Sequence, residues 1–230
     1  MKNKKTFKNI CIAIISISSF LYSACGENNV SSGNSFQENN NLSISIMPEN
    51  NQDNNEIIID EIKALISEVE FESEPSGQSQ YVSMDPFVLR FNEGIFSQIL
   101  TNKIPFGNYS KLKFKVHKPE DNETPPDPEF KEGNSGNQRY SFIIKGSYNG
   151  SAFTYKSKKS ASVILNFPSN VNFQESSKNI TISVNTSGIF KNGIEIIDPA
   201  NPEYQDLIDD NIRASFRKAF IDLDKNGLPD

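Results

Sequence analysis

The chain contains few of the residues on which nucleophilic enzymes and zinc proteins depend. Among its 230 residues there are two cysteines, one histidine and no tryptophan. The single histidine, His117, excludes zinc sites built on several histidines, and no Gly-x-Ser-x-Gly segment offers the nucleophile of a hydrolase. A pair of carboxylates of the kind that hydrolyses glycosides stays open, although no pattern singles one out. The composition therefore favours a protein without catalytic activity.

Both cysteines lie near the N-terminus, where the sequence predicts an export signal. Four lysines precede an apolar segment over residues 10–21, which is too short to span a bilayer. The small residues Ser23 and Ala24 then lead directly to Cys25. This pattern predicts a bacterial lipoprotein signal peptide over residues 1–24, with Cys25 as the lipidated N-terminus of the mature chain. The alternative is an ordinary signal peptide with a coincidental cysteine.

The predicted mature chain is acidic. The full sequence carries 23 Lys and Arg against 29 Asp and Glu, and removal of residues 1–24 leaves 19 against 29, a net charge of −10. Such a chain repels phosphate backbones, so we expect no nucleic-acid partner. The N-terminal lipid is then the expected contact with the membrane. Because Cys11 leaves with the signal and Cys25 is acylated, we expect no disulfide.

Composition divides the mature chain into three parts. Residues 25–40 are rich in Gly, Ser, Asn and Gln and have almost nothing to bury, which predicts a flexible, disordered tether. Residues 41–198 contain short apolar segments separated by turn residues, which predicts a β-sandwich domain. Residues 199–230 predict a C-terminal α-helix followed by an acidic loop.

Alternation of apolar and polar residues is clearest over residues 111–116. Leu112, Phe114 and Val116 alternate with three lysines, so we expect the apolar side chains to face a core and the lysines to face solvent. The fold class predicted from such segments is all-β, an antiparallel β-sandwich of the transthyretin or immunoglobulin-like kind. One segment, residues 57–71, also fits a helical turn in its middle, and we favour strands there.

Two segments depart from this pattern. Residues 118–139 are rich in proline, glycine and acids and predict a long loop between strands, which is either functional or a tolerated insertion. Near the end of the chain, Asn201 is a good N-cap and Pro202 suits the first helical position. The apolar residues that follow recur every four positions and predict one helical stripe: Tyr204, Ile208, Ile212, Phe216 and Phe220.

The last nine residues place oxygen-bearing groups at the spacing of a calcium loop. Side-chain oxygens occupy positions 1, 3, 5 and 9, and glycine at position 6 permits a sharp turn. The segment resembles the loops of EF-hands and thrombospondin type 3 repeats, without the position-12 glutamate of the former or the repetition of the latter. We expect weak calcium binding here, and a plain solvated turn is the alternative. The predicted ligands are Asp222, Asp224, Asn226, the Leu228 carbonyl and Asp230.

The body of the chain also resembles an uncharacterised all-β domain family of bacterial lipoproteins, a domain of unknown function. The shared features span residues 41–193 and include an opening strand that ends at Pro48, the segment 62–71, and a Pro-x-Gly-x-Tyr turn over residues 105–109. The resemblance implies a sandwich on a lipid anchor and carries no established chemistry, so it transfers no catalytic residues.

These observations lead to one functional expectation and one alternative. We expect a membrane-anchored lipoprotein that acts as a non-catalytic binding or envelope-structural module with a protein or polysaccharide ligand. The alternative is a hydrolase that acts on envelope or host glycans. Gly26, rather than an aspartate, follows Cys25, which favours transport to the outer membrane of the cell envelope.

Overall fold

A computed structural model describes residues 38–49, 56–73, 79–82, 85–92, 97–105, 107–133, 138–173 and 178–230. The predicted signal peptide, Cys25 and the tether up to residue 37 lie outside these ranges. In the part of the chain that is described, no helix is both long enough and apolar enough to cross a membrane.

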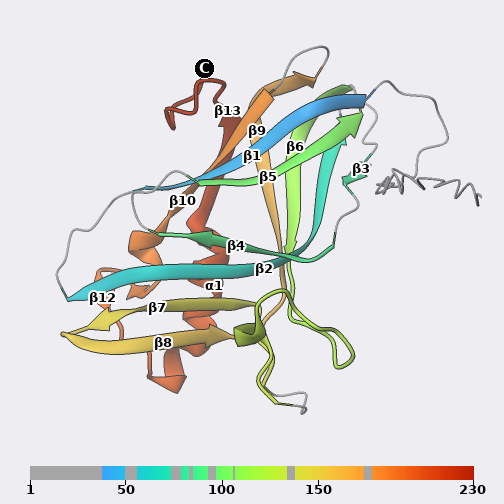
Figure 1. Ribbon diagram of the computed structural model, residues 1–230. Helices are drawn as coiled ribbons and strands as arrows, with labels where there is room; N and C mark the ends of the chain where they lie inside the picture. The colour runs from blue at the N-terminus through green and yellow to red at the C-terminus, as the bar shows by residue number, and fades with distance from the viewer. Residues whose placement is uncertain are drawn as a thin grey trace, which may run out of the picture.

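The described residues form thirteen β-strands, one α-helix and three short 3₁₀ helices (Figure 1). The strands are β1 (Glu38–Glu49), β2 (Ile57–Ser73), β3 (Ser79–Val82), β4 (Phe87–Phe91), β5 (Ser97–Pro105), β6 (Gly107–Val116), β7 (Phe142–Tyr148), β8 (Ser151–Ser157), β9 (Ala161–Phe173), β10 (Lys178–Asn185), β11 (Lys191–Asn192), β12 (Glu195–Ile196) and β13 (Phe216–Ile221). The helices are η1 (Pro128–Phe130), η2 (Thr186–Gly188), η3 (Pro202–Tyr204) and α1 (Gln205–Ser215).

Two sheets pack face to face, which confirms the predicted all-β sandwich with a C-terminal helix. The smaller sheet has the strand order β13-β10-β1-β5 and the larger one β8-β7-β2-β6-β9. Apolar side chains of both sheets meet in one core, for example where the Phe114 ring of β6 contacts the Phe216 ring of β13, with centroids 5.1 Å apart. One pair departs from the antiparallel expectation, because β1 and β10 run parallel.

Strand β2 connects the two halves of the larger sheet. Its first half lies between β4 and β7, and its second half lies between β3 and β6. Figure 1 shows β2 running beside β7 and then bending upward beside β6. Register shifts against β6 and β7 accompany this bend, as expected for β-bulges.

The alternation predicted over residues 111–116 is confirmed. Leu112, Phe114 and Val116 are buried in the core, while the three lysines point to the outer face of the sheet. On that face Lys113 forms ion pairs with Glu70 at 3.2 Å and with Glu72 at 2.5 Å. Cross-strand ion pairs with glutamates therefore hold two of the three lysines, Lys111 and Lys113.

The ends of the predicted elements need correction in two places. Strand β1 begins at Glu38, so the last residues assigned to the tether belong to the sandwich. The helical stripe stops at Ser215, and the chain from Phe216 to Ile221 is strand β13, paired with β10. A spacing of four residues fits one face of a helix and also alternate positions of a strand, so the stripe could not separate the two.

Candidate functional site

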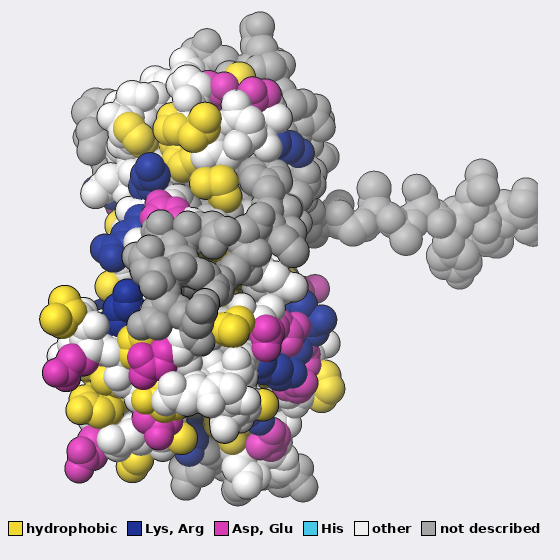
Figure 2. Space-filling model, turned by 90° about the vertical axis from the view of Figure 1, so that its left-hand side faces the viewer, with side chains coloured by type: hydrophobic (Ala, Val, Ile, Leu, Met, Phe, Trp, Pro, Cys, Tyr) yellow, Lys and Arg dark blue, Asp and Glu magenta, His cyan; other side chains and the backbone are white. Residues whose placement is uncertain are grey.

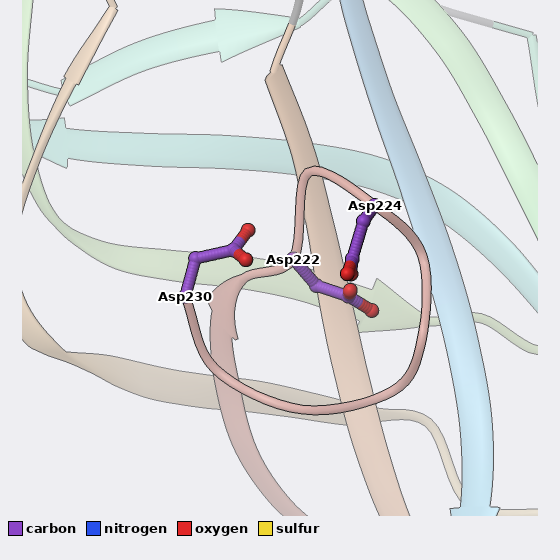
Figure 3. Close-up of side chains that lie close together, drawn as sticks. All are labelled: Asp222, Asp224 and Asp230. Atoms are coloured by element: carbon purple, nitrogen blue, oxygen red, sulfur yellow. The ribbon is translucent and has the colours of Figure 1, made fainter.

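The loop that follows β13 brings together three of the predicted calcium ligands. The carboxylates of Asp222, Asp224 and Asp230 each offer an oxygen, and these oxygens lie within 4.8 Å of one another. Figure 3 shows the carboxylates of Asp222 and Asp224 side by side within the loop, and that of Asp230 on its other side. Among the described residues, this is the one group of three or more potential metal-ligating side chains at such a distance.

Asp222 is the buried member of this group. Its carboxylate accepts hydrogen bonds from the Thr181 hydroxyl at 2.6 Å and from the amides of Asn226 and Gly227 at 2.9 and 3.0 Å. Gly227 has a φ of +82°, which allows the tight turn that glycine at position 6 predicted. A carboxylate has about four acceptor positions, so one remains for a cation.

Asn226, the fourth predicted side-chain ligand, is engaged in hydrogen bonds within the loop. The Asn226 side-chain oxygen accepts a hydrogen bond from the Leu228 amide at 2.7 Å, and its amide group donates to Asp224 at 2.8 Å. The polar atoms of the Asn226 side chain are therefore used in hydrogen bonds to other residues of the loop. Asp224 and Asp230 are exposed, and Asp230 also accepts a hydrogen bond from the Leu223 amide.

Beneath the loop lies a buried row of polar side chains that sequence reasoning missed. The Asn179 side chain on β10 accepts hydrogen bonds from Ser43 and Ser45 of β1, at 2.7 and 2.8 Å, and donates to Thr181 at 3.1 Å. Asn179 also donates to the Asp222 carbonyl at 2.9 Å. We call Ser43, Ser45, Asn179 and Thr181 the polar ladder. It joins the acidic loop to the middle of the smaller sheet.

In the sequence, Ser43 and Ser45 alternate with apolar residues, a pattern typical of a strand with one face open to solvent. In the structure Ser43 and Ser45 are 9 % and 0 % exposed, because the face of β1 opposite the core is also covered. Small polar side chains can occupy such a covered face when each finds a hydrogen-bond partner. The signal available in the sequence was the match between serines on β1 and Asn and Thr on β10, which becomes informative only once the two strands are known to pair.

A second group of charged side chains lies on the outer face of the larger sheet. Residues 119–132, here called the strap, leave β6, fold back over β2 and β7, and include η1. The buried Lys63 ammonium lies 3.0 Å from both Asp127 and Glu129 of the strap. Asp127 also pairs with Arg90, and Glu129 with Lys145 at 2.8 Å. The long loop predicted over residues 118–139 is therefore docked on the sheet where it is described.

The electrostatics of this group follow from its contacts. Burial tends to raise the pKa of Asp127, but the Glu129 amide, Lys63 and Arg90 outweigh it and hold that pKa below its ordinary value. Hydrogen bonds from Lys145 and Lys63 lower the pKa of Glu129. Burial tends to lower the pKa of Lys63, and its bonds to Asp127 and Glu129 raise it overall. All of these groups are thus charged near neutral pH.

The single histidine belongs to the same region. The side chain of His117 is 14 % exposed, and its Nε2 lies 2.6 Å from the Glu123 carboxylate. The other Glu123 oxygen is buried and has no hydrogen-bond partner. Among the described residues, the hydrogen-bond partner of the His117 ring is the Glu123 carboxylate, and a nucleophilic triad would need a hydroxyl or thiol beside this pair.

Comparisons with known proteins give no match that could guide the interpretation of these sites. A scan against protein-family models finds no match, and searches of curated proteins and of solved structures find none either. The resemblance to a lipoprotein domain of unknown function, and that of the acidic loop to calcium loops, therefore stay predictions from the sequence.

Proposed function

We propose that this protein is a lipoprotein of the bacterial cell envelope, anchored through Cys25, whose β-sandwich is a non-catalytic binding or structural module. The observation that carries the proposal is Cys25 itself, which follows an export signal directly. Strand β1 begins at Glu38, so residues 26–37 separate the proposed lipid from the folded body. On the face seen in Figure 2, hydrophobic, acidic and basic side chains of the described residues are interspersed, as expected for a water-exposed body.

Substitution of the anchoring cysteine tests this proposal. We expect Cys25→Ala to abolish incorporation of labelled fatty acid and to release the protein from the membrane fraction, because the acyl chains supply the membrane affinity. Cys11→Ala is the matched control, since Cys11 lies within the predicted signal and should leave labelling unchanged. Continued labelling of Cys25→Ala would refute the assignment. For the wild-type protein, protease treatment of intact cells would show whether the sandwich faces the outside of the cell or the periplasm.

We further propose that the acidic loop binds calcium weakly. The clustering of three carboxylates supports this, and carboxylate oxygens are the ligands that calcium prefers. The partly used oxygens and the exposed position argue for a dissociation constant of about 10⁻⁴–10⁻³ M, as in extracellular calcium modules.

Calorimetric titration of the mature protein measures this affinity. We expect heat of binding at millimolar calcium, and its loss in Asp224→Ala, which removes an exposed ligand and keeps the buried Asp222. Asp210→Ala is the control, because Asp210 lies on α1 and pairs with Arg213 outside the loop. No heat from the wild-type protein, or equal heat from wild type and Asp224→Ala, would exclude the site.

A further inference from the structure

The strap is an acidic segment that covers a basic part of the sheet. It carries six acidic residues and one basic residue: Glu120, Asp121, Glu123, Asp127, Glu129, Glu132 and Lys131. The sheet beneath presents cations to it, with Lys63 and Lys145 on neighbouring strands and Arg90 on β4. Further along, Lys156 of β8 pairs with Glu132. One acid of the sheet, Glu61, lies among these cations, 3.8 Å from Lys63 and 3.5 Å from Lys145, so the charge complementarity holds at the named pairs.

An aromatic side chain anchors the strap among these ion pairs. Phe130 is fully buried and packs with Leu65, Tyr140 and Ile143, and the partly buried Val88 completes this cluster. Leu65 and Ile143 point away from the sandwich core, so the cluster lies on the opposite face of the sheet. The strap thus combines two acids and an aromatic residue within Asp127–Phe130, all bound to side chains of the sheet.

The strap is held by side chains rather than by a strand ladder. Its backbone hydrogen bonds run within the strap or to residues 138–140, for example from the Tyr140 amide to the Phe130 carbonyl at 2.9 Å. Prolines at 125, 126 and 128 have no amide hydrogen to donate. Release of the strap would therefore leave the hydrogen bonds between the sheet strands in place.

The position of Lys63 indicates why release of the strap would cost the fold little free energy. A buried ion pair adds little stability over a well-packed apolar pair, and an unpaired buried ammonium is costly. With the strap in place Lys63 is 5 % exposed, and its neighbours Lys145 and Arg90 are partly exposed already. A lysine suits this position if the face is sometimes open to water, where the ammonium is solvated.

We propose that the strap fills a binding site on the outer face of the larger sheet. The partner for which this site is suited is an acidic polypeptide segment that carries an aromatic residue. The partner would displace the strap, place its carboxylates on Lys63, Arg90 and Lys145, and insert its ring beside Leu65 and Ile143. This inference rests on the proposed function as a binding module and names the chemistry of the partner. It makes the strap an internal competitor, so the free site is open in a small fraction of molecules.

A labelled synthetic peptide with the sequence of residues 121–132 tests the site. The variant Asp127→Asn with Glu129→Gln weakens the internal competitor and keeps the cations of the sheet. We expect the peptide to bind this variant about tenfold or more tightly than the wild-type mature chain, measured by fluorescence anisotropy, because apparent affinity scales with the open fraction. Adding Lys63→Met should abolish the gain. Glu70→Gln with Glu72→Gln is the control, since it makes the same charge change on β2, away from the strap.

Hydrogen exchange of the same proteins reports on the strap itself. In the double variant we expect faster exchange at residues 129–132 and Tyr140, with unchanged protection in β2 and β6. Three outcomes would overturn the inference: strap amides as protected as in the wild type, an open strap with no gain in peptide binding, or loss of the sheet when the strap is weakened. Each is independent of the Cys25 experiment, so the binding site and the lipid anchor can fail separately.

Discussion

Phe114→Ala should lower the free energy of unfolding by about 3–5 kcal/mol, the usual cost of removing a buried phenylalanine ring. The Phe114 side chain is 6 % exposed and lies in the core between the two sheets. Its ring meets that of Phe216 edge-on, at an interplanar angle of 73°. The substitution would therefore open a cavity at the contact between β6 and β13 and weaken the packing of one sheet on the other.

Lys113→Ala is the matched control for this measurement. Lys113 is the neighbour of Phe114 on β6 and points to the outer face, where it pairs with Glu70 and Glu72. Partly exposed ion pairs contribute little, so we expect a loss of less than about 1 kcal/mol. Urea denaturation of both variants gives the comparison. Similar losses from the two substitutions would contradict the assignment of inner and outer faces to β6.

Asp222→Ala should be the most damaging substitution in the acidic loop, with a loss of about 2–4 kcal/mol. The substitution leaves the buried Thr181 hydroxyl and the amides of Asn226 and Gly227 without their acceptor. It also removes the side-chain link from the loop to Thr181 of the polar ladder, while the bond from Asn179 to the backbone carbonyl at position 222 remains. The exposed Asp224 offers the contrast, and Asp224→Ala should cost less than about 1 kcal/mol.

The measurement should be made with a calcium chelator present, so that any bound ion does not contribute to the difference. Thermal or urea unfolding then reports the hydrogen-bond network alone. If Asp222→Ala and Asp224→Ala were equally stable without calcium, the buried carboxylate would have no structural role in the loop.

The sandwich could be predicted from strands that have one packed face and one solvent-facing face. Over residues 111–116 one face is packed and the other is paired with glutamates, so the alternation is visible in the sequence. In β2 both faces are covered between Ile62 and Ile66, because Leu65 packs under the strap while Ile62 and Ile66 face the core. With apolar residues on both faces of the strand, Ile62, Leu65, Ile66 and Val69 fall at positions i, i+3, i+4 and i+7, which is why this segment also fitted a helix.

Other features depended on contacts that the sequence does not reveal. The strap looked like an insertion, since Asp127 and Glu129 have their partners Lys63 and Lys145 at 16 or more positions away in the chain. The clustering of Asp222, Asp224 and Asp230 was predictable because all three residues lie within one short loop. The burial of Asp222 was not, since it depends on Thr181, 41 positions earlier in the chain.

The parallel pairing of β1 with β10 has a mechanical consequence for an anchored protein. Strand β1 is the first strand of the body, and it lies between β10 and β5. With the chain anchored through Cys25 as proposed, a pull on the body reaches it at Glu38 and acts along β1. Hydrogen bonds on both sides of β1 run across this direction, so they share the load in shear and do not open one at a time. We expect the sandwich to resist traction from the membrane better than a body tethered through an edge strand.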